Sequence, residues 1–539
     1  MTEQQHRPEA DALQQTHGAV RQLRQDLSRW LDQSSLMDGP HRNHGGEDEA
    51  NYALTWFPHY LVTGEAAIID RFQSLLADLL TWVRTDGHHG YEPEAEAHHG
   101  TEPFLLFLPR YLALCPEDTG ALEALEDAAH HIGNWVEEIP AWYDEARDCF
   151  HSWKIGSRVI GDDPRYAIEV AEHLRFVHIA LAAHRVSDQT ESRYLTWALR
   201  YGRKRAERLL AASGQVPLAW NQAGEPLYWD QVRDRPEMKG MVALAHKVDG
   251  DPLAGVENHL ASGAVQCYGD LYEASGDEIF RDAARRLVAP LIGEIGDRFG
   301  DVSAVAISHY RQVFGDTGFD AELMAVIDSF PVPSDAPLTL MLPEDATRRE
   351  PGPGKRSDML YWGEWGEDGS ARPLIQPSTA ALTLAYQLTG DVEYARRALD
   401  QASRKFNMAR RILRGGREHA DMGGAICSVA AGHGRNWGAG AVTGCYGPLL
   451  LGARDAFGAV RPTVVVSDRE GTQRIPEDVL SLVQPAVAGE GELLLYNGSD
   501  VPQDLAWRHG TGQDVPVSLA AGETKRFPLV ATVESEKSL

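Results

Sequence analysis

The segment QLTGDVEYARRALDQASRKF, residues 387–406, links the end of an apolar helix to a second, amphipathic helix through a turn of Thr, Gly and Asp. A Thr, Ser or Asp in this position can cap the second helix, and an acidic residue in its first turn interacts favourably with the helix dipole. The same pattern recurs along the chain at 60–79, 114–132, 185–204 and 273–291, and more loosely at 315–330. The sequence therefore predicts a series of helical hairpins.

Within each hairpin the first helix is more apolar than the second, as a comparison of TEPFLLFLPRYLALC (101–115) with ALEALEDAAHHIGNWVEE (121–138) illustrates. A helix that is apolar on all sides is buried, whereas an amphipathic helix lies outside. The hairpins, closed by a further inner helix at 437–457, predict an (α/α)6-7 toroid. An open α-helical array is the alternative, and the long loops before the inner helices favour the toroid.

The pattern changes after residue 460, where short apolar runs such as PTVVVSD and ELLLYNG alternate with Gly, Asp, Asn and Pro. These runs predict about five to seven strands and a small C-terminal antiparallel β-sandwich. The fold class is therefore mainly α. We expect an N-terminal helical segment at 1–40, an (α/α) toroid catalytic domain at 41–459 and a C-terminal β domain at 460–539.

Composition excludes several classes of function. The chain has 51 Lys and Arg against 79 Asp and Glu, a net charge of −28, and such an acidic surface repels nucleic acids and anionic membranes. The polar N-terminus lacks the apolar stretch of a signal peptide, and nothing in the sequence is long and apolar enough to span a bilayer. The expectation is a cytoplasmic protein without nucleic-acid or membrane partners, and no pattern decides its oligomeric state.

The loops that precede the inner helices of a toroid meet at one mouth, and here they are rich in His, Arg, Tyr and Trp. Flat aromatic faces in such Gly-rich loops suit stacking on sugar rings. The candidate catalytic residues are His99, His151, Tyr91, Tyr361 and Arg158. The candidate substrate-binding residues are Asn43, His44, Glu102, Trp153, Trp362, His419, Arg435 and Trp437. His309 also falls near an inner helix, whereas His173 and His178 lie within an apolar helix and are expected to be hydrogen-bonded core histidines.

The residues proposed for the site also have purely structural interpretations. The segment HRNHGGEDE (41–49) also reads as the charged, capped start of a helix, and each Trp or Tyr also reads as core. A metal site built from His44, His98 or His99, and Glu102 has suitable donors, but no HExxH-like spacing supports it. We therefore expect no required cofactor, with a divalent metal as the alternative.

The hairpin pattern over about residues 40–460 resembles the carbohydrate-active (α/α)-toroid enzymes, which include polysaccharide lyases and glycoside hydrolases. The resemblance is at the level of the superfamily and implies an oligosaccharide substrate. Toroid lyases of the chondroitinase and heparinase II/III type place β-sandwich material after the toroid, and the β segment here is also C-terminal, although smaller. This order favours a lyase.

A uronate lyase works by β-elimination, which needs a base, an acid for the leaving oxygen and a group that neutralises the substrate carboxylate. The resemblance implies His99 or His151 as base and Tyr91 or Tyr361 as acid. Asn43, Arg158 and Arg435 would hold the carboxylate, which suits the fork of an Arg guanidinium.

The rival enzyme class is an inverting glycoside hydrolase, which uses two carboxyl groups about 6.5–9.5 Å apart. Glu47, Asp48 or Glu49 paired with Glu364 or Glu367 would supply them from opposite sides of the mouth. A non-catalytic carbohydrate-binding toroid is a third hypothesis, and an isomerase or dehydratase acting on a small molecule is a fourth.

Overall fold

Helical hairpins make up most of the molecule. The computed structural model describes residues 3–33, 50, 53–93, 95–96, 101–132, 137–187, 193–232, 235, 253–296, 301–341, 361–374, 376–412 and 438–530. Within this part of the chain, consecutive helices pair as α3 (Trp56–Thr63) with α4 (Ala66–Thr85), α5 (Leu108–Leu114) with α6 (Thr119–Ile132), α7 (Leu174–Val186) with α8 (Arg193–Ala211), α12 (Ala264–Ser275) with α13 (Glu278–Val288), α14 (Asp301–Phe314) with α15 (Asp320–Asp328), and α16 (Thr379–Thr389) with α17 (Val392–Ile412). Each pair spans one of the segments from which the sequence predicts a hairpin.

Two of the hairpin turns, α12–α13 and α16–α17, share one local design. Gly276 and Gly390 end their helices in the left-handed conformation, with φ of 67° and 69°, which glycine adopts without steric cost. The residue after each glycine then caps the next helix: Asp277 accepts a hydrogen bond from the N–H of Ile279, and Asp391 accepts one from the N–H of Glu393. The repeated sequence therefore ends one helix and starts the next within three residues.

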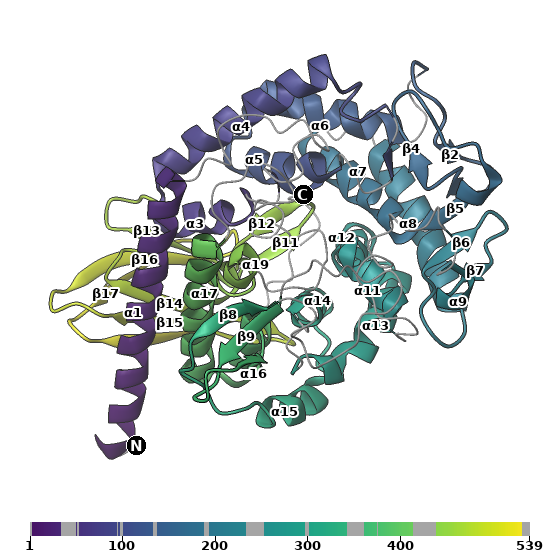
Figure 1. Cartoon of the computed structure of the whole chain (residues 1–539). Helices are drawn as coiled ribbons and strands as arrows, with labels where there is room; N and C mark the ends of the chain where they lie inside the picture. The colour runs from purple at the N-terminus through teal and green to yellow at the C-terminus, as the bar shows by residue number, and fades with distance from the viewer. Residues whose placement is uncertain are drawn as a thin grey trace.

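The helices follow one another around a ring in chain order (Figure 1). The ring closes where its two ends meet, because α1 (Glu3–Gln33) packs along α17 and α3 packs on α20 (Tyr446–Leu451). Where α1 packs along α17, the ring centres of Trp30 and Phe406 lie 4.9 Å apart, and Asn407 donates a hydrogen bond of 2.7 Å to Asp26. The expected hairpins therefore form a closed array and not an open one.

Shorter helices and small antiparallel sheets complete the ring. The short helices are η3 (Pro103–Phe107), η4 (Pro164–Tyr166), η5 (Ala171–His173), α9 (Trp229–Val232), α11 (Ala254–Ala261), η7 (Ala289–Glu294) and α19 (Gly438–Thr443). The sheets are β1 (Ala95–Glu96) with β4 (Lys154–Ile155), β2 (Tyr143–Asp144) with β3 (Cys149–Phe150), β5 (Ile168–Val170) with β6 (Ala219–Asn221) and β7 (Pro226–Leu227), and β8 (Leu338–Met341) with β9 (Tyr361–Trp365) and β10 (Ala371–Pro373).

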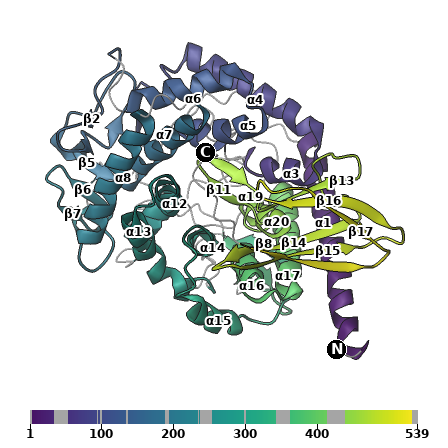
Figure 2. The ribbon, with the colours of Figure 1, turned by 180° about the vertical axis from the view of Figure 1, so that it is seen from behind.

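The C-terminal strands form two antiparallel sheets beside α1, as the view from behind shows (Figure 2). One sheet has the order β13 (Val464–Asp468), β16 (Gln503–His509), β17 (Val515–Leu519), and the other has β14 (Val479–Val487), β15 (Glu490–Asn497), β18 (Thr524–Leu529). The rings of Trp507 and Phe527, one from each sheet, lie 5.2 Å apart. Ser481 of β14 donates a hydrogen bond to the carbonyl of Leu450, so this β unit packs directly on the ring.

The last predicted inner helix, 437–457, is shorter in the structure. Gly452 ends α20 with a φ of 59°, and the chain turns into the hairpin of β11 (Arg454–Ala456) and β12 (Ala459–Arg461). The turn at Phe457 and Gly458, where φ is 49° and 72°, reverses the chain within the range that the sequence predicts to be helical. The described helices include none that is long and apolar enough to cross a membrane.

Candidate active site

A cavity of about 290 Å³ lies at the centre of the ring. Its walls come from the first helix of each hairpin, and the β11–β12 hairpin projects into it; the second helices contribute no lining residue in the described part of the chain. The first helices are therefore the inner ones. The charged side chains and histidines in the wall are Glu102, Arg110, Arg175, His178, Asp270, His309, Arg454 and Asp455, and polar side chains there include Ser308, Gln312 and Thr383.

A buried ion pair lies on one side of the cavity. Arg175 of α7 binds the carboxylate of Glu102, and both residues are at most 3% exposed. Arg175 also donates a hydrogen bond of 3.3 Å to Thr101. Oε2 of Glu102 is buried without a hydrogen-bond partner among the described residues. A buried acceptor of this kind is costly to leave unsatisfied, so its position against a cavity points to a ligand or water.

Asp270 of α12 is the most perturbed carboxyl group in the cavity wall. Burial raises its pKa to about 8, with the negative charge of Glu273 adding to the effect. Its Oδ2 accepts a hydrogen bond of 2.9 Å from the N–H of Phe457, and its Oδ1 is buried without a partner in the described part of the chain. At neutral pH this carboxyl is protonated and can act as a proton donor.

His178 faces Asp270 from α7. Its Nε2 lies 3.0 Å from the carbonyl of Gly263, and because a carbonyl oxygen only accepts hydrogen bonds, Nε2 carries the ring proton. Nδ1 then carries the lone pair and lies 4.0 Å from Oδ2 of Asp270, which is too far for a direct hydrogen bond. Burial lowers the pKa of His178 to about 4, so the ring is neutral at physiological pH.

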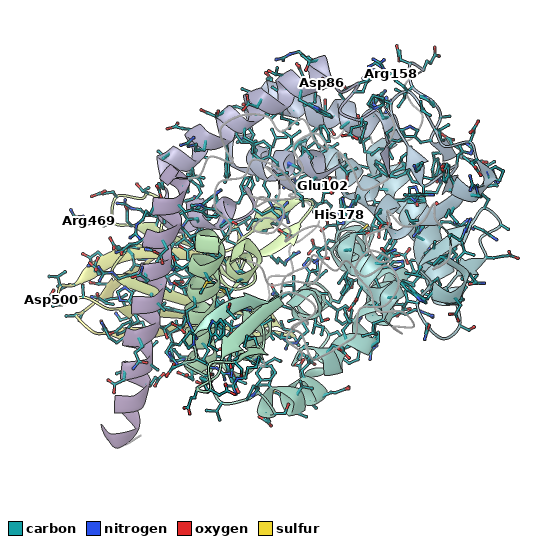
Figure 3. The ribbon with its side chains drawn as sticks, viewed as in Figure 1. Asp86, Glu102, Arg158, His178, Arg469 and Asp500 are labelled. Carbon is teal, nitrogen blue, oxygen red and sulfur yellow. The ribbon has the colours of Figure 1, made fainter. Side chains whose placement is uncertain are left out.

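His309 of α14 adds a second neutral imidazole to the wall. Burial and the nearby positive charge of Arg454 lower its pKa to about 3. Its Nε2 is buried without a hydrogen-bond partner among the described residues. Glu102 and His178 lie together near the centre of the ring, whereas Arg158 lies at its outer edge (Figure 3).

The arginines that line the cavity each face a carboxylate. Nη2 of Arg110 lies 2.7 Å from Oδ1 of Asp455, Arg175 binds the carboxylate of Glu102, and Arg454 binds the carboxylate of Glu273. The guanidinium groups therefore fix the positions of carboxylates, and Nε of Arg110 is left as a buried donor without a partner among the described residues.

Of the residues that the sequence suggested for the site, Glu102 lines this cavity. Tyr91 is buried, and its hydroxyl donates a hydrogen bond of 2.9 Å to the carbonyl of Ala128. Trp153 is buried with its ring near Tyr166, while His151 is partly exposed and Arg158 is exposed. These four residues do not line the central cavity.

Other suggested residues fall elsewhere. Glu364 of β9 is buried, and its Oε2 lies 3.6 Å from Nη2 of Arg372. Glu367 is exposed beside the same sheet. Neither residue lines the cavity. The backbone of Tyr361 and Trp362 belongs to β9, but their side chains lie outside the described part of the protein. The remaining candidates also lie outside it: Asn43, His44, Glu47, Asp48, Glu49, His98, His99, His419, Arg435 and Trp437.

Asp270, Arg175 and His178 are not among the site residues expected from the sequence, because those residues were expected in the loops and these three lie in the inner helices. His173 is the expected core histidine, since its ring is hydrogen-bonded to the backbone of Val170 and Ser152. His178 is hydrogen-bonded too, yet it also lines the cavity. The available signal was the spacing of Arg175 and His178, three residues apart in an otherwise apolar helix.

Two comparisons by sequence found nothing, since no protein-family model and no curated protein match this chain. Solved structures that resemble it include an unsaturated glucuronyl hydrolase specific for heparin, with 12% identity, a TM-score of 0.42, and coverage of 72% of this chain and 96% of that one. They also include cellobiose 2-epimerase from Spirochaeta thermophila, with 13% identity, a TM-score of 0.37, and coverage of 63% and 85%. Likeness at this level does not identify a reaction, so the chemistry of this chain has to follow from its own cavity.

Proposed function

We propose that the protein is an acid–base enzyme that hydrolyses a glycosidic bond of a sugar bound in the central cavity, with Asp270 as general acid. The observation that carries the proposal is the state of Asp270: burial raises its pKa to about 8 at a position that lines the cavity. A carboxyl group that stays protonated at neutral pH is the usual proton donor to a glycosidic oxygen.

Glu102 is the second carboxyl group in this mechanism. It forms an ion pair with Arg175, and its Oε2, which has no partner among the described residues, is the atom that would take a proton from an attacking water. Arg175 and His178 are three residues apart on α7, so one helical face, over a rise of about 4.5 Å, carries the partner of Glu102 and the neighbour of Asp270. A charged and a protonated carboxyl group in one cavity match the two roles that glycoside hydrolysis requires.

The pairing of the cavity arginines favours a neutral sugar over a uronate. The carboxylate of a uronate would add a negative charge beside arginines whose charges already face Asp455, Glu102 and Glu273, and a buried charge without a compensating partner is costly. A neutral sugar needs only hydrogen bonds. The side-chain oxygens of Gln312 and Thr383 in the wall can accept them, although the hydroxyl protons of Ser308 and Thr383 are already donated to Gln387 and to the carbonyl of Thr379. For this reason hydrolysis is the first candidate reaction, and the β-elimination that the sequence favours is the second.

β-Elimination remains the second candidate because of His178. Its neutral ring presents the Nδ1 lone pair beside Asp270, which gives a base and an acid side by side. In this mechanism His178 removes the proton next to the uronate carboxyl group, and Asp270 protonates the leaving oxygen.

A product assay separates the two reactions. The purified protein would be incubated with neutral and uronate-containing oligosaccharides while reducing ends and ultraviolet absorbance are followed together. Hydrolysis predicts new reducing ends without absorbance, and Asp270→Asn and Glu102→Gln should each abolish them. Glu367→Gln is the matched control, because Glu367 is exposed and outside the cavity. Reducing ends accompanied by absorbance would replace hydrolysis with elimination, and full activity in Asp270→Asn would overturn both.

A further inference from the structure

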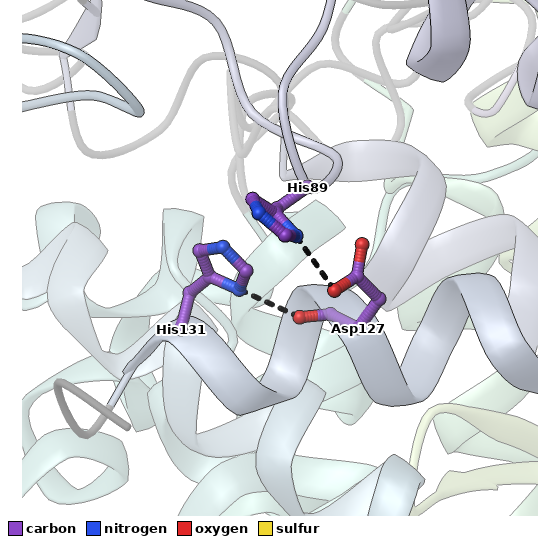
Figure 4. Close-up of side chains that lie close together, drawn as sticks. All are labelled: His89, Asp127 and His131. Atoms are coloured by element: carbon purple, nitrogen blue, oxygen red, sulfur yellow. Dashed lines mark hydrogen bonds and ion pairs between the residues drawn. The ribbon is translucent and has the colours of Figure 1, made fainter. Parts of the chain in front are cut away.

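A second cluster of chemically active side chains lies outside the central cavity. His89 follows α4, and Asp127 and His131 lie four residues apart on α6, which brings them to one face of that helix. One ligand atom from each of the three residues lies within 4.8 Å of those of the other two (Figure 4). None of the three lines the cavity.

The hydrogen bonds of His131 fix which of its nitrogens is free. Its Nδ1 lies 2.7 Å from the carbonyl oxygen of Asp127, so Nδ1 carries the proton and Nε2 has the lone pair. That Nε2 is buried and has no hydrogen-bond partner among the described residues, and the residue as a whole has no solvent-exposed surface. A histidine whose one nitrogen donates to a backbone carbonyl while the other is bare has the arrangement of a metal ligand.

His89 and the side chain of Asp127 supply the other donors. Nδ1 of His89 lies 2.8 Å from Oδ1 of Asp127, and the rings of His89 and His131 lie 4.2 Å apart. His89 has a φ of 54° and forms, with Gly90 at 87°, the two-residue turn that the paired backbone groups of His88 and Tyr91 close. This turn fixes the backbone of the residue that completes the cluster.

We propose that His89, Asp127 and His131 form a binding site for a divalent transition metal of the Zn²⁺ type. Two imidazole nitrogens and one carboxylate oxygen suit Zn²⁺, whereas Ca²⁺ and Mg²⁺ favour sites made of oxygen alone. The metal would take the lone pair of His131 that the protein leaves without a partner. Because His89 and the two helical residues come from separate elements, the ion would tie the segment after α4 to α6.

The experiment is a direct binding measurement on the full chain. The protein would be stripped with a chelator, dialysed and titrated with Zn²⁺ in a calorimeter, and Co²⁺ would be added to a parallel sample to record its absorption spectrum. We expect one Zn²⁺ per chain, a tetrahedral Co²⁺ spectrum and a higher melting temperature with Zn²⁺ than without it. Failure to bind stoichiometric Zn²⁺ would overturn the proposal.

Variants then locate the ion. Asp127→Asn and His89→Ala change partly exposed side chains, so the variants should fold, and each should weaken Zn²⁺ binding by at least about tenfold. His88→Ala is the matched control, since His88 is the neighbouring histidine but lies outside the cluster. Unchanged affinity in Asp127→Asn, or an equal loss in His88→Ala, would show that the ion binds elsewhere. Glycosidase activity does not enter this test.

Discussion

Nδ1 of His178 lies 4.0 Å from Oδ2 of Asp270, and the same carboxyl oxygen accepts a hydrogen bond from the N–H of Phe457. His178 and Asp270 come from two inner helices, whereas Phe457 belongs to the turn between β11 and β12. The hairpin that projects into the ring therefore orients the group to which we assign the proton transfer.

Replacing Asp270 with Asn should remove the acid while keeping the shape and the hydrogen bond from Phe457. Loss of a general acid lowers kcat by about 10²- to 10⁴-fold, and we expect a change in this range with little change in KM. Steady-state kinetics on the substrate identified by the product assay, together with the circular dichroism spectrum of the variant, would check this. A variant that unfolds would be replaced by Asp270→Glu, which should lose activity less severely.

The pH dependence of the rate should report the same group. The pKa of Asp270 is raised to about 8 by burial, so the acid is protonated below that pH and loses its proton above it. We expect kcat/KM to fall about tenfold per pH unit above pH 8, whereas an unperturbed carboxyl group would already be inactive as an acid at pH 6. A profile that declines above pH 4 or 5 would contradict the assignment.

Acid should unfold the protein through its buried histidines. Burial lowers the pKa of His173, His259 and His309 to about 3 and that of His178 to about 4. In the unfolded chain these rings take up protons near pH 6.5, so the stabilisation from keeping them neutral is present above that pH and is lost as pH falls towards 3.

Urea unfolding at pH values from 7 to 4 would measure this effect. His259→Gln changes a buried ring that does not line the cavity, and the free energy of unfolding of this variant should fall less steeply with acid than that of the original chain. Equal slopes would mean that carboxylates, and not these histidines, cause the acid unfolding.

Two hairpin glycines offer a matched pair of substitutions. Gly276 and Gly390 have φ of 67° and 69°, so alanine at either position should cost about 1–2 kcal/mol in the free energy of unfolding for the left-handed backbone. A Cβ at Gly276 meets nothing within 4 Å, whereas one at Gly390 would lie 3.0 Å from the side-chain oxygen of Gln484. Chemical denaturation should therefore find Gly390→Ala the more destabilising of the two, and the reverse order would contradict this account.

The hairpins are predictable from sequence because their signals are local. A glycine with positive φ and an aspartate cap occupy neighbouring positions at 276–277 and again at 390–391, so a few residues determine the turn and the start of the next helix. The β11–β12 hairpin was missed although it carries a local signal. Its residues, RDAFGAVR at 454–461, are more polar than the helix before them, and the chain reverses at Phe457 and Gly458, whose φ values of 49° and 72° fit a two-residue hairpin turn.

The site is harder to predict because it depends on the inner faces of helices. Glu102 could be selected from its loop, but its partner Arg175 lies 73 residues later in the chain. Asp270 carries no local sign of its function, since its raised pKa results from burial by elements that are distant in sequence. Which face of each inner helix points to the centre is a tertiary property, and the sequence of one helix alone does not determine it.

The contact that closes the ring also constrains how the chain folds. Asn407 and Asp26 are hydrogen-bonded across 381 residues of sequence, and Trp30 packs on Phe406 at the same contact. During synthesis from the N-terminus, α1 emerges long before α17, so its apolar face lacks this partner while the hairpins between them are made. Pairing over so long a separation is slow to form, whereas each hairpin joins neighbouring segments and forms quickly. The helices can therefore assemble one hairpin at a time, with the association of α1 and α17, which joins the two ends of the ring, as a late step.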